Sequence, residues 1–211
     1  MTSARLLDIA IREFGIHGLE GASTRGIAAT AGTAMSAITY HYGGKEGLYL
    51  AAADRISELM AERVGGTLAD SPEDGAFGPA AARDRVVTLL SRMTDAMASP
   101  DTESWTLFIV REQMHPTAAF ERIYAGGMGA MLRTLAQLVE IATGAASRTA
   151  RIVAMTLIGQ PLALRASRAT FLRLLEADEL GAEDLTDIKA RIAANANAIL
   201  DRLSAEAREI S

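Results

Sequence analysis

Apolar residues recur every three or four positions along most of the chain, and short stretches rich in glycine and proline separate these segments. This spacing places the apolar side chains on one face of a helix. Clusters of β-branched residues bounded by turn dipeptides, which mark strands, are nearly absent. The sequence therefore predicts an all-α protein, with helices over about 3–14, 24–31, 34–41, 45–68, 81–98, 102–114, 117–143, 147–177 and 183–207.

Glycine and the small polar residues set the expected ends of the first three helices. Gly15 and Gly18 should stop the first helix, leaving 19–22 as a loop before a second helix capped by Ser23 or Thr24. Gly32 offers the left-handed backbone of a tight turn, and Thr33 should cap the third helix.

Four further features interrupt the helices in the rest of the chain. Gly43-Gly44 should separate the third helix from a long fourth one, and the turn-rich segment 69–79 is the clearest boundary. Glycines weaken the segment 117–143, and the helix over 147–177 should bend at Pro161, where a carbonyl loses its partner.

The second and third helices form the most informative stretch. Ile27, Ala28, Ala31 and Ile38 are apolar at helical spacing on either side of the Gly32 turn, so two short helices should cross closely there. The third helix would bury Ile38 and present small or polar side chains outward. This surface suits a DNA major groove about 12 Å wide. Candidates to face base edges are Ala34, Met35, Ser36 and Thr39.

This stretch resembles the DNA-binding signature of TetR-type bacterial transcriptional regulators. The resemblance covers about residues 3–50 and implies a helix-turn-helix domain at 1–50 on a helical effector-binding and dimerisation domain at 51–211. It implies phosphate contacts, which fix register without reading sequence, for Thr24, Arg25, Tyr40, His41 and Lys45. The alternative is that Tyr40 and Tyr42 are packing residues and that Lys45 is a solvated residue at a helix start. Packing is favoured for Tyr42, and DNA contact for Arg25 and Lys45. The matching residues are Thr24-Arg25, Ile27-Ala28, Ala31-Gly32, Tyr40-His41-Tyr42, Lys45 and Leu48.

Charge and composition narrow the class of protein. The net charge of -5 lies entirely beyond residue 50, because residues 1–50 hold four basic and four acidic side chains. The N-terminal end is therefore the expected DNA face. The chain has no cysteine, no long apolar segment and no signal peptide, so a cytoplasmic protein without disulfides or membrane contact is expected.

Motifs for chemistry are lacking in the sequence. There is no nucleophile elbow and no dinucleotide fingerprint, and Gly43-Gly44-Lys45 lacks the other residues of a phosphate loop. His17, His41 and His115 are too scattered for a metal site. The sequence thus predicts no enzyme, no metal and no cofactor.

Most aromatic residues of the second domain gather around Pro116. A cleft with apolar walls and few polar groups is what a small-molecule effector needs. The alternative, that Trp105 and Phe108 are core and Arg111 pairs with a neighbour, is equally open. REQMHPTAAFERIY and Ile158-Gly159-Gln160 resemble the C-terminal domain of the CecR-like branch of the family, which implies a link to antibiotic tolerance and membrane transport. The effector candidates are Trp105, Phe108, Arg111, Glu112, His115, Phe120 and Tyr124.

The last two long helices carry wide apolar stripes. Two such helices from each of two chains would form the four-helix interface usual in the family, although burial within one chain explains part of both stripes. One short helix reads few base pairs, whereas two copies of the N-terminal domain 1–50, called the head below, read a palindrome. The stripes are Ile152, Met155, Leu157, Ile158, Leu162 and Leu164, then Leu185, Ile188, Ile192, Ile199, Leu200 and Leu203.

These observations together predict a homodimeric repressor that binds double-stranded DNA at a palindromic operator and is released by an unidentified small-molecule effector. Two alternatives stay open. The chain could be a helical enzyme or small-molecule carrier whose first domain is only structural, or it could activate transcription instead of repressing it.

Overall fold

The computed structural model describes residues 3–68 and 78–210, and all regular structure in these ranges is helical, as predicted. Residues 69–77, most of the predicted boundary loop, lie outside the described residues. No described helix is long and apolar enough to cross a membrane. The elements are α1 (Ser3–Gly21), α2 (Thr24–Ala31), α3 (Met35–Tyr42), α4 (Lys45–Leu68), α5 (Pro79–Ala98), the 3-10 turn η2 (Pro100–Thr102), α6 (Glu103–Met114), α7 (Ala118–Ile123), the π-helical turn η3 (Tyr124–Met128), α8 (Gly129–Thr143), α9 (Ser147–Ala166), α10 (Arg168–Leu174) and α11 (Ala182–Ile210).

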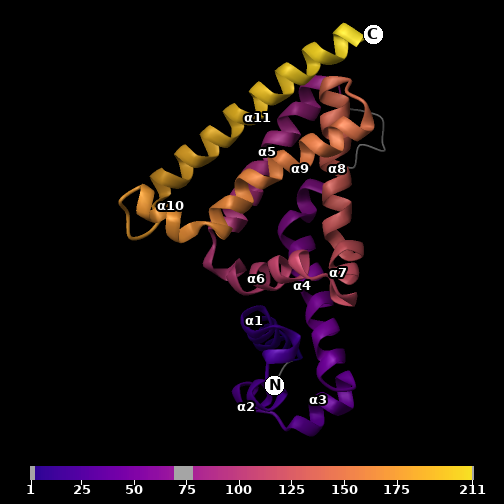
Figure 1. The fold of residues 1–211 in the computed structure, drawn as a ribbon, viewed down its shortest axis with the longest axis vertical. Coiled ribbons are helices and arrows are strands. Elements are labelled where there is room, and N and C mark those ends of the chain that lie inside the picture. Colours follow the sequence, from indigo (N-terminus) through magenta and orange to yellow (C-terminus); the bar gives the residue numbers. More distant parts are fainter. Residues whose placement is uncertain (1–2, 69–77, 211) are drawn as a thin grey trace. The chain divides into compact units, whose positions relative to one another are not determined.

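The chain forms two compact units, which Figure 1 shows with the elements labelled. Unit 1 contains residues 1–62 and 101–130, so it joins α1, α2, α3 and the first part of α4 with α6, α7 and η3. Unit 2 contains 63–100 and 131–211. The functional boundary expected at residue 50 stays a prediction.

The first helix is longer than predicted. It does not stop at Gly15, because this glycine lies against α6, where a Cβ would come within 2.8 Å of the Ser104 carbonyl oxygen. Gly18 bends the helix instead, with φ at 71°, and the chain then turns helically through Gly21. The expected loop at 19–22 was therefore wrong up to Gly21, because the glycines here serve a long-range contact and a kink.

The turn between α2 and α3 follows the prediction closely. Ser23 caps α2 and its side chain accepts a hydrogen bond from the Gly26 amide. Gly32 is left-handed, and the Gly32 and Thr33 amides bond back to the last turn of α2, which is a Schellman motif. Thr33 was the wrong cap, since Ala34 holds the N-cap position of α3 without a side-chain hydrogen bond.

Unit 1 is built on contact between α1 and α6, which pack along each other. Phe14 of α1 and Phe108 of α6 both contact the ring of Tyr49 on α4, at centroid distances of 4.9 and 4.6 Å. All three side chains are buried. This aromatic group joins α1, α4 and α6 in one core.

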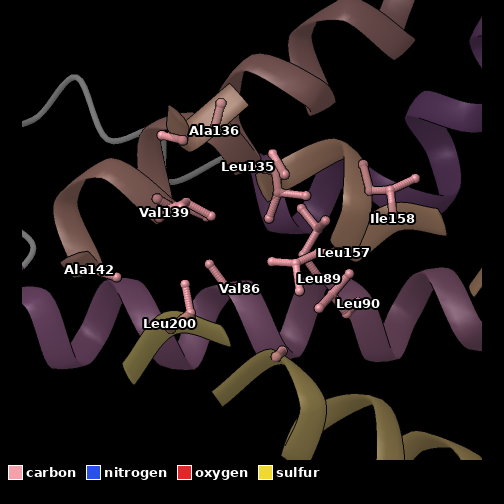
Figure 2. Packing of buried hydrophobic residues seen from close by; sticks show 14 of the residues in the cluster. Val86, Leu89, Leu90, Leu135, Ala136, Val139, Ala142, Leu157, Ile158 and Leu200 are labelled. Carbon is pink, nitrogen blue, oxygen red and sulfur yellow. The ribbon is translucent and has the colours of Figure 1, made fainter. Parts of the chain in front are cut away.

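Unit 2 has its own core, part of which Figure 2 shows. Side chains from α5, α8, α9 and α11 converge on it, with Val86, Leu89 and Leu90 from α5 at its centre. The opposing residues are Leu135, Val139, Leu157, Ile158 and Leu200. Four amphipathic helices thus bury their apolar faces against one another.

Two predicted helices are divided in the structure. The segment 117–143 forms α7, η3 and α8, because a π-helical turn that includes Gly126 and Gly127 occupies Tyr124–Met128. The segment 147–177 forms α9 and α10, and the break falls at Ser167. Helix α9 continues through Pro161, so the proline does not end it.

Candidate nucleic-acid interface

Helix α3 presents the side chains that were predicted to face bases. Met35, Ser36 and Thr39 are exposed, with Met35 at 49% exposure, whereas Ile38 is buried and fixes the helix on the head. Ala34 is also exposed and immediately precedes the helix. The surface is small and weakly polar, so it can contact thymine methyl groups and form single hydrogen bonds to bases or phosphates.

The candidate phosphate contacts lie at the ends of two helices. Thr24 and Arg25 occupy the first turn of α2, where free backbone amides and the helix dipole favour an anion. Within the described part of the chain, no hydrogen bond or ion pair holds the exposed Arg25 guanidinium. Tyr40 is 85% exposed and meets His41 edge to face. These groups are free to meet a phosphate backbone.

Lys45 and Tyr42 make contacts within the head. The Lys45 ammonium donates a hydrogen bond to the Glu20 carbonyl oxygen at 2.8 Å, near the end of α1. The half-buried Tyr42 shares a hydrogen bond with Ser3, 2.9 Å between the oxygens. Tyr42 thus packs within the head, as favoured, whereas Lys45 has a structural contact whether or not it also meets DNA.

The seven effector candidates occupy three different environments. Trp105 and Phe108 are buried core residues. The Arg111 guanidinium donates to the carbonyl oxygens of Gly15 and Ile16, so it secures α1. His115 is exposed, and the partly buried Phe120 stacks on the exposed Tyr124 at 5.9 Å. The core interpretation holds for the two buried aromatics, and effector binding by the set stays a prediction.

Glu112, the seventh candidate, is a buried carboxylate with only 1% exposure. Its Oε1 accepts a hydrogen bond of 2.6 Å from the Tyr49 hydroxyl. Its Oε2 accepts from the Thr117 amide, the Thr117 hydroxyl and the Phe120 amide at 2.9 to 3.0 Å. Four donors within the protein explain why a carboxylate is buried here.

Sequence reasoning missed two residues that shape this region. Tyr49 follows Lys45 by one turn, and burial together with its hydrogen bond to Glu112 raises the pKa of its phenol. Gly47 lies so close to α3 that a Cβ there would come within 1.6 Å of the Tyr42 carbonyl oxygen. The repeat of Leu48, Ala52 and Ile56 on one face of α4 could have indicated that Tyr49, beside it, is also buried.

Comparison with known proteins defines the class. Residues 6–52 match the family described as bacterial regulatory proteins, tetR family. Residues 82–203 match the C-terminal domain of the HTH-type transcriptional dual regulator CecR. The chain belongs to the TetR family of transcriptional regulators, in the branch that has this CecR-type C-terminal domain.

Individual relatives agree with this assignment. The HTH-type transcriptional dual regulator CecR of Shigella flexneri is 34% identical over 174 residues, which cover 80% of this chain and 77% of that protein. The repressor AcnR of Corynebacterium diphtheriae is 32% identical over 50% of this chain and 45% of its own. A TetR-family regulator from Streptomyces coelicolor shares the fold, with a TM-score of 0.67, 18% identity, and coverage of 95% of both chains.

Proposed function

We propose that this regulator is a homodimeric repressor that binds a palindromic operator and leaves it when a small molecule binds. The observation that carries the proposal is the exposed surface of α3 beside the solvent-accessible first turn of α2. A helix of this kind enters the major groove while the preceding helix meets the backbone. Because α3 has only two turns, one copy reads few base pairs, and a second copy is needed for a selective site.

The outer face of α9 is the surface proposed for dimerisation. Ile152, Met155 and Leu162 are exposed there, whereas Leu157, Ile158 and Leu164 of the same predicted stripe are buried in unit 2. An exposed apolar row on a helix whose other face is already in the core is typical of a protein interface. Neighbouring Gly159 and Ala163 are also exposed and would allow a close approach.

The exposed face of α11 extends the same surface. Ala190, Ala194 and Ala198 recur every four residues there, and Asn195 hydrogen-bonds Gln160 of α9 at 2.9 Å. A groove of about 780 Å³ runs between α9, α10 and α11, with Leu164, Phe171, Ile188 and Ile192 among its apolar lining. Larger side chains of a second copy could fill this groove, in a twofold arrangement in which each chain offers the same surface.

Phe120 and Tyr124 are the two aromatic residues of the predicted effector set that are not buried. The two rings stack at the junction of α7 and the π-helical turn η3, and such turns often occur at functional sites. AibR, a structural neighbour with 15% identity and a TM-score of 0.66, was solved with isovaleryl coenzyme A and operator DNA. To move a population from 1:99 to 99:1, an effector needs about 5.5 kcal/mol of preference for the released state.

Repression is favoured over activation because the relative AcnR is named a repressor, although CecR is named a dual regulator. A regulator whose ligand is the chromosome acts in the cytoplasm of a bacterium. The proposed function requires no catalytic step. The alternative function, a small-molecule carrier, differs from it because a carrier would not bind DNA.

Binding to the promoter fragment of its own gene tests the proposal. We expect the purified chain to shift the mobility of this duplex as a dimer and to discriminate it from an unrelated duplex of equal length. Bovine albumin serves as the control protein that does not bind DNA. If the chain shifts neither duplex more than albumin does, it is not a DNA-binding regulator. Retention of DNA binding by a monomer would overturn the dimer while leaving regulation intact.

Lys45→Ala tests the phosphate assignment. If the ammonium neutralises one phosphate, the variant should bind all duplexes more weakly, and the slope of log K against log salt should become shallower by about 1. The slope is measured by fluorescence anisotropy between about 50 and 200 mM salt. Because Lys45 also holds the Glu20 carbonyl, a weaker complex with an unchanged slope would mean that its role is structural.

Met35→Ala should have a different effect, because Met35 is proposed to face bases. The variant should alter the ranking of sequences in a library of sites and leave the salt slope unchanged, since it removes no charge. The matched control is Met114→Ala, which truncates an exposed methionine outside α3. Identical rankings for Met35→Ala and the unmodified chain would contradict the assignment.

A further inference from the structure

The two oxygens of Glu112 serve two different parts of unit 1. Oε1 accepts from Tyr49, which lies on α4 one turn after Lys45. Oε2 accepts from Thr117, the N-cap of α7, and from Phe120 in the first turn of that helix. A carboxylate is a rigid planar group. A rotation that keeps Oε2 on its donors therefore changes the distance from Oε1 to the Tyr49 hydroxyl.

On the α4 side, Tyr49 is bound closely to the DNA-binding head. Its ring lies between Phe14 of α1 and Phe108 of α6. Two residues earlier, Gly47 is packed on the Tyr42 carbonyl at the end of α3. A displacement of Tyr49 along or across α4 therefore acts on α1 and on the end of the recognition helix α3.

On the α7 side, the carboxylate completes the helix cap. The Thr117 hydroxyl accepts from the Ala119 amide and donates to Glu112, and the Phe120 amide donates to the same oxygen. Phe120 in turn stacks on Tyr124. A group that displaces these rings must shift the first turn of α7 and with it the donors to Oε2.

We propose that Glu112 is a positioning residue that couples the start of α7 to the DNA-binding head through Tyr49. When α7 holds Oε2, Oε1 faces the Tyr49 hydroxyl and α4 is fixed. When the first turn of α7 moves, the buried carboxylate and the phenol lose alignment, and the head is no longer held in one position. The inference rests on the proposed DNA-binding function and deepens it by naming the link.

A double-mutant cycle tests the coupling with the full-length chain and its own promoter fragment. Thr117→Ala removes one of the three donors to Oε2 together with the side-chain cap of α7, and Tyr49→Phe removes the hydroxyl that donates to Oε1 while it keeps the packed ring. Thr117→Ala should lower DNA affinity at least about threefold when Tyr49 is present, and less than about 1.5-fold in the Tyr49→Phe chain, as expected for coupled sites. Thr186→Ala, a threonine of α11 in unit 2, should change neither.

The readout separates coupling from loss of stability. Both variants are expected to lower the unfolding temperature, so affinities are compared at a temperature where circular dichroism shows all four proteins folded. Equal effects of Thr117→Ala in both backgrounds, or no effect in either, would overturn the coupling while DNA binding stands. If the unmodified chain binds no DNA, the proposed function fails as well, and the two failures are thereby distinguished.

Discussion

Replacing Gly47 with alanine should disrupt the turn between α3 and α4 and abolish DNA binding. The added Cβ would lie 1.6 Å from the Tyr42 carbonyl oxygen and 2.8 Å from its carbon. Both are backbone atoms, so no side chain can move aside, and the start of α4 must separate from α3. We expect a loss of about 3 kcal/mol or more in the stability of the head, at the upper end of overpacking effects.

The measurement is chemical unfolding followed by circular dichroism, together with anisotropy on labelled operator DNA. Gly26→Ala is the matched control, because a Cβ there would meet only Ser23 atoms at 3.6 Å or more. Alanine is a better helix former than glycine, so this control should be neutral or stabilise by up to about 1 kcal/mol. An unfolding midpoint of Gly47→Ala equal to that of the unmodified chain would show that the close contact is absent in solution.

The glycines show which parts of the fold could be predicted from the sequence. The α2–turn–α3 motif could be predicted to within about one residue, because Ser23, Gly32 and Gly43 act through their own local backbone. Gly15 could not be interpreted in this way, since its partner Ser104 lies far along the chain. Local rules assign every glycine to a break, whereas some glycines mark close packing.

The same limit applies to the candidate effector site. Trp105, Phe108 and Glu112 lie three and four residues apart, so they share one face of α6, and that face is buried. The sequence could indicate the shared face but not whether it borders a cavity or the core. The acceptor role of Glu112 depends on Tyr49, 63 positions away, which no local pattern specifies.

The surface proposed for dimerisation could be predicted only in part, for a related reason. The wide apolar stripe on α9 was predicted to serve a four-helix interface and, in part, burial within one chain. The structure divides its six residues into a buried inner set and an exposed outer set. Leu157 and Ile158 of the inner set lie in the core of unit 2, as Figure 2 shows. The outer set is not needed for that core, so its role in a second interface can be tested without unfolding the chain.

Met155→Glu combined with Leu162→Glu should convert the protein to a monomer. Each copy would place two carboxylates in an apolar interface, where unpaired charges are strongly unfavourable. We expect the dimer dissociation constant to rise at least about 100-fold, equivalent to about 2.8 kcal/mol. Light scattering after size exclusion measures the mass, and circular dichroism should show unchanged helix content, because both side chains are exposed in one chain.

The affinity for the operator should fall when the dimer dissociates. Two heads joined by an interface bind two half-sites as one unit, and a separated head must bind each half-site alone, so the loss in affinity should exceed tenfold. The matched control is Met114→Glu, which makes the same substitution at an exposed methionine of α6 in unit 1. This control should leave the mass of the particle unchanged. A double variant that keeps the dimer mass would remove α9 from the interface, because two buried carboxylates per chain cannot remain unpaired there without a measurable cost.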